Sequence, residues 1–582
     1  MTELINFSNK SLDFFKQTKY IFQGITYTIF YNGTLYNLPE LKSNLISSGF
    51  YFDVPSRVNN IDDSLVLIAC FIKYGYDMVE KLNGAYSFAI WNENKNELFL
   101  VRDHFGIKPL YYTLIDNTML FSANVKDLFK DSRVEPILDK QGMCELFGLG
   151  PAHTSGFTPF KNIFELKPAH FTIYNHSGLK TKKYWQLKSM PHKHSIGKTC
   201  EIIRDLLKDS IQNHINVNNV QNTPSSLCTF LSGGLDSSIV TFYTANFYKE
   251  HDLGPLNTYS VDYIDNDKNF VKTDFQPNSD SYFIKLAIKR FGVNHKTILL
   301  DTPDLANSLK DSMMARGFPG MADIDSSLLL FCKKVQPHSN IALTGECADE
   351  FFCGYPWFFR EDCLSSKTFP WSMAIKERQN LLSLDVSSKI DLQDYIDYRY
   401  TETLKNVPRL DDDSPATAKM REITYLTLNW FMQTLIDRAD KMAFCSNVEI
   451  HVPFCDYRLA QYVWNIPWEL KTLKGREKGL LRYAMKGLLP SEIIDRKKSP
   501  YPKTCNPTYL NCVKNMLSNI INNSQSPINY LIDKNYVQEI LDTDGRNFTH
   551  PWFGQLMTGP QLMAYLCQIN MWLEKYNPKI EI

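Results

Sequence analysis

One short motif carries the small and polar groups that suit a polyphosphate: Ser232-Gly233-Gly234-Leu235-Asp236-Ser237-Ser238. An apolar run over 227–231 precedes it and a run typical of a helix, 237–250, follows, so we expect a strand, a tight turn and a helix. Glycine lets the backbone approach a ligand closely, and a helix N-terminus offers free N–H groups and positive potential. Asp236 would repel a phosphate unless a cation lay between them. The motif therefore predicts a site for pyrophosphate with Mg²⁺.

The alternative is an ordinary Ser/Gly turn in front of a helix. A Walker-type phosphate loop ends in Gly-Lys-Ser or Gly-Lys-Thr, and the motif at 232–238 lacks that ending. This difference favours attack at an α-phosphate, with pyrophosphate leaving, over chemistry at a γ-phosphate.

A second polar segment, 344–350, follows another apolar run and holds three carboxylates. Carboxylates concentrated at the end of a buried strand are costly unless cations neutralise them. The functional interpretation makes Asp349 a second Mg²⁺ ligand beside Asp236 and gives Glu346 a catalytic or substrate-facing role. The alternative is an acidic helix N-terminus stabilised by the helix dipole.

Two basic segments follow later in the chain. Lys478 lies in the charged stretch 475–482, where it could stabilise negative charge that grows on an α-phosphate; a solvated helix start is the alternative. The cluster 496–498 with Lys503 is interpreted as a local anion contact or as plain surface.

The elements that must position these residues fall into two patterns. Residues 20–125 contain mostly strand-like runs with one amphipathic helix over 63–82, which predicts an antiparallel α+β domain. After a polar connection over 187–199, strands alternate with helices, which predicts a doubly wound parallel sheet. In such sheets ligands bind beyond the carboxyl ends of the strands. We therefore expect 232–238 and 344–350 to converge, with Val261 available to an adenine.

The bulk composition limits the partners. A chain of 582 residues is expected to form two or more domains, and its formal net charge of zero gives no global attraction to nucleic acid or an anionic membrane. No apolar stretch approaches the length of a membrane helix, and no signal-peptide pattern is visible. The 13 cysteines form no CxxC pairs, which suits a reducing compartment. We expect a cytoplasmic enzyme without nucleic-acid or membrane partners.

The chain resembles the asparagine synthetase family, which joins a glutaminase domain of the N-terminal nucleophile type to a pyrophosphatase-loop synthetase domain. The motifs that carry the resemblance are YNGTLYN at 31–37, LNGAYSFAIW at 82–91, RDHFGIKPLYY at 102–112, FLSGGLDSS at 230–238, TGECADEFFCGY at 344–355, EIHVPFCDYRL at 449–459 and REKGLLR at 476–482. It implies a truncated type-2 glutamine amidotransferase-like domain over 1–187 and an asparagine synthetase domain over 188–582. The expected fold is an incomplete α+β sandwich like that of N-terminal nucleophile hydrolases. An α/β domain with a parallel sheet and a helical C-terminal part follows it.

The resemblance also implies roles for individual residues, with ATP and Mg²⁺ as cofactors. The positions that match ATP contacts are Phe230, Leu231, Val261, Thr344 and Gly345. Those that match the pyrophosphate loop are Ser232, Gly233, Gly234, Asp236 and Ser237. Asp236 and Asp349 match Mg²⁺ ligands, Glu346 matches a carboxylate at the acyl-acceptor site, and Lys478 matches a lysine that stabilises the transition states. The substrates implied are an aspartate-like carboxylate and ammonia, and a homodimer is a candidate assembly.

The sequence departs from the family's pattern near the N-terminus. Position 2 is Thr, where the family's glutaminase has its catalytic cysteine, and the first cysteine is Cys70. No arginine precedes Arg57, so the arginine that clamps the glutamine carboxylate is also missing. We expect the family's opening strands to be absent, with the recognisable pattern beginning near Tyr27. Without a nucleophile no glutamyl thioester forms, and we expect no glutamine hydrolysis by this chain as written.

Other glutaminase positions are retained. Asn32 and Gly33 match the oxyanion-hole positions and Asp63 matches an amine-binding aspartate, whereas Thr34 replaces the usual Glu. Three explanations stay open: a start site placed too late, a decayed domain on an ammonia-dependent synthetase, or a relative such as β-lactam synthetase or a lasso-peptide cyclase. The close match of the second half favours the first two.

Smaller departures occur in the second half. Cys347 and Cys353 stand where the family often has Gly, and His451 where it usually has Arg. The two cysteines lie close to the expected active strand end, so an altered activity is an open possibility. The sequence as a whole predicts an AMP-forming ligase that makes L-asparagine from L-aspartate and ammonia. The alternatives are an amide or lactam ligase of specialised metabolism and a non-catalytic binding module.

Overall fold

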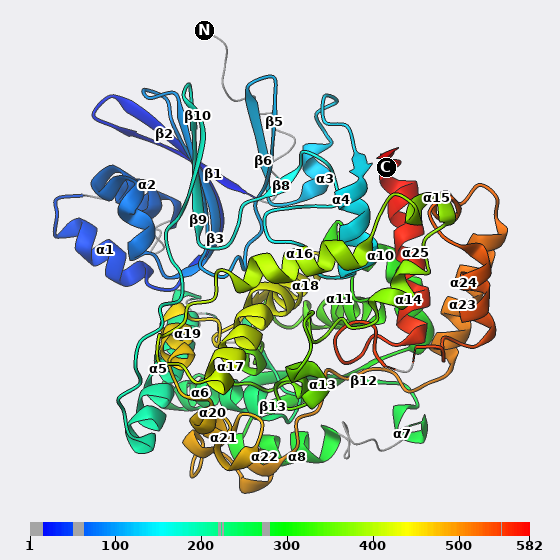
Figure 1. Ribbon diagram of the computed structural model, residues 1–582. Coiled ribbons are helices and arrows are strands. Elements are labelled where there is room, and N and C mark those ends of the chain that lie inside the picture. The colour runs from blue at the N-terminus through cyan, green and yellow to red at the C-terminus, as the bar shows by residue number, and fades with distance from the viewer. Residues whose placement is uncertain (1–14, 51–62, 219–222, 224–225, 270–279, 549) are drawn as a thin grey trace. The chain divides into compact units, whose positions relative to one another are not determined.

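The computed structural model describes all residues except 1–14, 51–62, 219–222, 224–225, 270–279 and 549 (Figure 1). The chain forms two compact units, each described here by itself. Unit 1 comprises Met1–Pro136 and Ser155–Leu187, and unit 2 comprises Ile137–Thr154 and Lys188–Ile582.

Unit 1 is built on a six-stranded antiparallel sheet in the order β1-β2-β3-β4-β9-β10. Its strands are β1 (Lys16–Phe22), β2 (Ile25–Leu35), β3 (Gly84–Asn92), β4 (Glu97–Arg102), β9 (His170–Asn175) and β10 (Gly178–Lys183). The central strands β3 and β4 are buried almost throughout. Burial on both faces means that another layer covers each face of the sheet.

The two covering layers differ in kind. On one face, helices α1 (Leu38–Ile46) and α2 (Asp63–Tyr74) pack against Ile29, Phe88 and Phe99 in one hydrophobic core. On the other, a small sheet in the order β6-β5-β8 packs in a second core. The small sheet contains β5 (Tyr111–Ile115), β6 (Thr118–Ser122) and β8 (Phe164–Glu165), and helix α3 (Val125–Leu128) follows β6. The expected helix over 63–82 is α2 followed by a 3₁₀ turn, Gly75–Lys81, whereas α1 was not expected.

Unit 2 contains a five-stranded sheet, all parallel, in the order β13-β12-β11-β14-β15. Its strands are β11 (Leu227–Phe230), β12 (Asn257–Tyr263), β13 (Asn294–Leu300), β14 (Ile341–Leu343) and β15 (Glu449–His451). The helices that alternate with the strands are α5 (Ile196–Val217), α6 (Leu235–Glu250), α7 (Asn266–Asn269), α8 (Asp280–Phe291), α9 (Thr302–Asn307), α10 (Leu309–Arg316) and α11 (Asp323–Val335). The carboxyl ends of all five strands therefore meet at one edge, as the alternation predicted.

Helices dominate the rest of unit 2. They are α12 (Ala348–Phe351), α13 (Glu361–Leu364), α14 (Ile375–Gln379), α15 (Leu384–Ser387), α16 (Leu392–Leu404), α17 (Pro415–Leu426), α18 (Met432–Phe444), α19 (Tyr457–Trp464), α20 (Trp468–Lys471), α21 (Gly479–Ala484), α22 (Ser491–Asp495), α23 (Thr508–Asn522), α24 (Lys534–Asp542) and α25 (Gly559–Tyr576). Among the described helices, none has the length and apolar character needed to cross a bilayer.

The segment Ile137–Thr154 precedes the boundary at residue 187 that the sequence suggested, yet it belongs to unit 2. Strand β7 (Ile137–Asp139) pairs in parallel with β16 (Lys579–Glu581) at the C-terminus. Helix α4 (Lys140–Met143) and a π-helical turn, Cys144–Leu149, follow β7. The buried guanidinium of Arg378 donates one hydrogen bond, from Nη1, to the carbonyl of Gly148, and Tyr565 Oη donates to that of Leu146 at 2.8 Å.

Candidate active site

The loop that follows β11 is shaped by glycine. Gly233 has a φ of +70°, in the region that favours glycine, and a Cβ there would lie 2.7 Å from Phe283 Cβ. Gly234 caps helix α6, so the loop connects the strand directly to the helix N-terminus. The hydroxyls of Ser232 and Ser237 lie 3.0 Å apart across the turn. The strand, turn and helix expected from the sequence are confirmed, and free N–H groups at the start of α6 suit an anion.

The second polar segment lies beside this loop because β14 pairs with β11. Its Gly345 packs against the start of α6 so closely that a Cβ would lie 2.7 Å from Asp236 C and Ser237 N. Asp349 follows on helix α12. Two segments more than a hundred residues apart thus place their carboxylates in one cluster, as the parallel sheet predicts.

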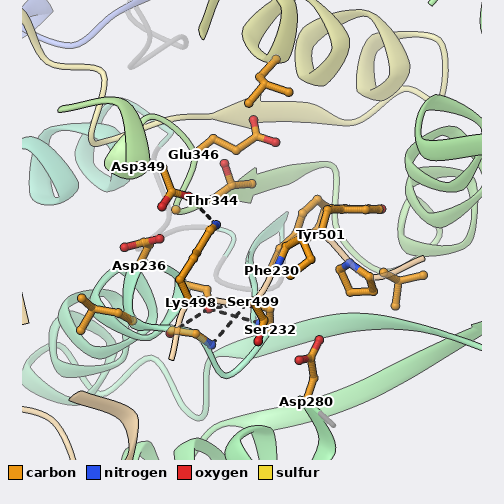
Figure 2. A pocket seen from close by; sticks show the side chains of 18 of the residues that line it. Phe230, Ser232, Asp236, Asp280, Thr344, Glu346, Asp349, Lys498, Ser499 and Tyr501 are labelled. Atoms are coloured by element: carbon orange, nitrogen blue, oxygen red, sulfur yellow. Dashed lines mark hydrogen bonds and ion pairs between the residues drawn. The ribbon is translucent and has the colours of Figure 1, made fainter. Parts of the chain in front are cut away.

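Two lysines neutralise these carboxylates. Lys478 Nζ forms an ion pair with Asp236 and lies 2.6 Å from Asp349 Oδ1. Lys498 Nζ lies 2.6 Å from Asp349 Oδ2 (Figure 2). The side chain of Lys478 is only 2% exposed. Gly354 closes the cluster, because a Cβ there would overlap Asp349 Oδ1 and Lys478 Cε. We call Asp236, Asp349, Lys478 and Lys498 the ion cluster.

The charges of the ion cluster support one another. Burial disfavours ionisation of Asp349, but the ammonium groups of Lys478 and Lys498 outweigh it and lower the pKa of Asp349 to about 2. Burial likewise disfavours a charged Lys478, and the two carboxylates raise its pKa nonetheless. Asp349 and Lys478 are therefore charged at neutral pH, whereas burial raises the pKa of Asp236 and Lys478 opposes that rise.

The cluster also fits the Mg²⁺ that the family implies. Asp236 Oδ1 is buried and accepts no hydrogen bond from the described residues. Those residues contain no group of three or more His, Cys, Asp or Glu side chains that could hold a metal. Two carboxylates without further protein ligands suit Mg²⁺, which is commonly bound through one or two carboxylates together with substrate phosphates.

A cavity of about 270 Å³ opens beside the cluster. Of the residues that the sequence assigned to ATP, pyrophosphate, Mg²⁺ or catalysis, all but Gly233 line it: Phe230, Leu231, Ser232, Gly234, Asp236, Ser237, Val261, Thr344, Gly345, Glu346, Asp349 and Lys478. Phe230 packs edge-on against Phe331, with ring centroids 4.6 Å apart, on an apolar side of the cavity. The cavity thus joins an apolar wall to a charged end, the combination that a nucleotide requires.

Glu346 faces the cavity near Arg438. Burial raises the pKa of Glu346 to about 7, although Arg438, whose Nη1 lies 3.7 Å from Oε1, opposes the rise. Arg438 itself is held by Asp325 at 3.2 Å and by the carbonyl of Ile324 at 2.9 Å. A carboxyl that titrates near neutral pH is able to accept or release a proton during a reaction.

Sequence reasoning missed several residues of the site. Arg496 donates a hydrogen bond to the carbonyl of Ser232 at 3.1 Å and pairs with Asp280, so it links the loop at 232–238 to the start of α8. Lys498 joins the ion cluster directly. The basic run over 496–498 was the available signal, but no spacing pattern links it to a loop more than 250 residues earlier.

The two unusual cysteines occupy positions suited to glycine. Cys347 and Cys353 have φ values of +73° and +59° and are buried. Burial raises the pKa of the Cys353 thiol to about 11, so it is neutral. The third departure, His451, is buried with its ring centroid 5.4 Å from that of His214.

The glutaminase-like positions lie in unit 1. Gly33 has a φ of +140°, and a Cβ there would overlap the carbonyl oxygen of Ala85. Asp63, at the start of α2, accepts hydrogen bonds from Tyr31 Oη at 3.0 Å and Leu35 N at 3.2 Å. Burial of Cys70 raises the pKa of its thiol to about 12. Residue 2 lies outside the described residues, so the expected loss of the nucleophile and of the opening strands stays a prediction.

The fold and the site suit an enzyme that binds a nucleotide beside a phosphate-binding loop, and comparisons with known proteins show its family. The asparagine synthase family matches residues 203–574, and the glutamine amidotransferase domain family matches residues 20–185. The chain is 41% identical to asparagine synthetase [glutamine-hydrolyzing] 3 of Bacillus subtilis (strain 168), over 96% of this chain and 89% of that one. It is 28% identical to asparagine synthetase [glutamine-hydrolyzing] 1 of the same organism, over 90% of this chain and 82% of that one. The chain belongs to the asparagine synthetase family and is an ATP-dependent carbon–nitrogen ligase of that family.

Replacement of the buried lysine tests the ion cluster. We expect Lys478→Met to lower the ATP-dependent ligase rate at least about 100-fold, because both carboxylates lose a counter-ion and the site loses a cation. Lys474→Met, at an exposed position four residues earlier, is the matched control and should keep the wild-type rate. Equal rates for the two variants would contradict the role given to Lys478.

A single methyl group tests the packing of the cluster. Gly354→Ala places a Cβ against Asp349 Oδ1 and Lys478 Cε, so the ion pair must separate. We expect a loss of ligase rate of at least about tenfold, with the fold retained by circular dichroism. Gly197→Ala, whose Cβ would meet no atom within 4 Å, should leave the rate unchanged. A fully active Gly354→Ala enzyme would show that the close approach is unnecessary.

Proposed function

We propose that the chain is an AMP-forming amide ligase that converts L-aspartate to L-asparagine through an aspartyl-adenylate, with ammonia as the nitrogen donor. The ion cluster beside the loop at 232–238 is the observation that carries this proposal. Pyrophosphate is the leaving group that such a combination of loop amides and cations stabilises best.

The nucleotide would lie along the cavity. Phe230, Leu231 and Val261 line it and would supply apolar contacts for the base, and Thr344 and Gly345 line it as further contacts for the nucleotide. Asp236 and Asp349 would hold Mg²⁺, which neutralises charge on the phosphates when bound. Lys478 then stabilises the charge that develops on the α-phosphate and on the departing pyrophosphate.

Two bond exchanges complete the reaction. A carboxylate oxygen of aspartate bonds to the α-phosphorus while the bond to pyrophosphate breaks. Ammonia then bonds to the activated carbonyl carbon, AMP leaves, and one proton is lost from the nitrogen. Glu346, with a pKa of about 7, is suited to accept that proton.

Ammonia is proposed as the donor because the described residues of unit 1 offer no accessible cysteine. The first cysteine of the chain, Cys70, is fully buried in α2. The alternative is an amide or lactam ligase of specialised metabolism with another acid and amine. We also propose a cytoplasmic location, which suits a sequence with 13 cysteines and no CxxC pair, and a homodimer.

The experiment is ATP–pyrophosphate exchange with a panel of carboxylic acids, followed by amide synthesis with ammonium or glutamine. We expect exchange that requires L-aspartate, and asparagine formation with ammonium but not with glutamine. Exchange that is silent with aspartate and active with another acid would replace the proposal by the alternative.

Two variants, one in each unit, test in the same assay which unit carries the synthetase reaction. Asp236→Ala should abolish exchange, because it removes a carboxylate of the ion cluster. Asp63→Ala, in unit 1, should leave ammonium-dependent synthesis within about twofold of wild type. Equal losses in both variants would contradict this division of labour.

A further inference from the structure

A second cavity, of about 360 Å³, lies in unit 2 and shares no lining residue with the first. Trp464 at the end of α19, Trp468 at the start of α20 and Met420 on α17 supply apolar walls. We call it the Lys471 cavity, after the lysine that lines it.

Lys471 is a buried cation without a described counter-ion. The residue is 5% exposed, and its Nζ forms no hydrogen bond or ion pair with any residue in the described part of the chain. Burial lowers its pKa, and the nearby guanidinium of Arg421 adds to that effect, while the thiol of Cys353 opposes it. An isolated ammonium in such a place is costly, and a bound anion would remove the cost.

A second feature points to an anion at the same place. The N-terminus of α17, a helix of 12 residues, opens on the cavity through Ser414 and Thr417, and the positive end of a helix dipole favours negative charge. Asp413 does not compensate Lys471, because it pairs with Arg421 at 2.7 Å and accepts a hydrogen bond from Leu410 N.

The walls limit the kind of anion. Asp412 also lines the cavity and is exposed, so a polyanion such as a nucleotide would be repelled. The guanidinium of Arg421 already lies over the Trp464 ring, 5.5 Å from its centroid, and Phe358 stacks on Trp468. The apolar lining that Trp464, Trp468 and Met420 still offer the cavity suits a small apolar body. One negative charge attached to an apolar group satisfies both conditions.

We propose that the Lys471 cavity binds a small organic monocarboxylate, whose carboxylate pairs with Lys471 and whose apolar part contacts Trp464 and Trp468. The site is separate from the synthetase cavity and does not depend on the function proposed for it. Thr424 lines the cavity and interacts with the Cys353 thiol, four residues after Asp349 in the chain. A bound ligand would therefore be linked to the segment of Asp349 through Thr424 and Cys353.

The test uses benzoate as the probe and benzamide as its neutral isostere, with binding to the full chain measured by isothermal titration calorimetry. We expect benzoate to bind at least about tenfold more tightly than benzamide. Lys471→Met should weaken benzoate at least about tenfold and leave benzamide unchanged. Lys474→Met, which changes an exposed lysine, should bind benzoate like wild type.

Two further arms locate the site. Met420→Trp fills the cavity while keeping Lys471, and should abolish benzoate binding in a chain whose circular dichroism is unchanged. Lys478→Met alters the other cavity and should bind benzoate normally. Inorganic phosphate should bind more weakly than benzoate, because of Asp412. Equal affinities for benzoate and benzamide, benzoate binding unaffected by Lys471→Met or Met420→Trp, or loss of binding in Lys478→Met would each overturn the proposal.

Discussion

The synthetase unit depends on the pairing of two buried carboxylates with two lysines. Desolvating charges costs several kcal/mol per ion unless opposite charges lie within contact distance. Asp236, Asp349, Lys478 and Lys498 meet that condition, and they come from four separate segments of the chain. Removal of one partner leaves an uncompensated buried charge. The ion pairs therefore fix three parts of the chain relative to one another: the segments that follow β11 and β14 and the segment before α21.

Glycine makes that arrangement possible at three points. Gly233 lets the loop lie against helix α8. Gly345, just after β14, packs against the start of α6, and Gly354 leaves room for the Asp349–Lys478 pair. Cys347 and Cys353 show the converse, because they hold left-handed backbone that glycine would adopt more readily. The site thus combines tight backbone packing with some local strain, a combination common in functional sites.

Local patterns in the sequence predicted a large part of the fold of unit 2 and of its candidate active site. The loop at 232–238 and the acidic segment at 344–350 could be recognised because each follows a strand, and parallel strands end at one edge. Arg496, Lys498 and Asp280 could not, since their partners lie far away in the sequence and a charged surface run has the same composition. The resemblance to a family raised Lys478 above the ordinary interpretation of a basic helix start. The cavity around Lys471 left no usable sequence signal, because a lysine that follows Trp464 and Trp468 at helix-like spacing is typical of any amphipathic helix.

The segment Ile137–Thr154 has a practical consequence for dissecting the protein. Its strand β7 is the partner of β16, its Gly148 carbonyl accepts from buried Arg378, and its Pro151 carbonyl accepts from Arg316 at 3.1 Å. A synthetase fragment that begins at residue 188 would expose those donors and strip the C-terminal strand of its neighbour. A stand-alone catalytic half would instead have to carry residues 137–154 in trans or by circular permutation.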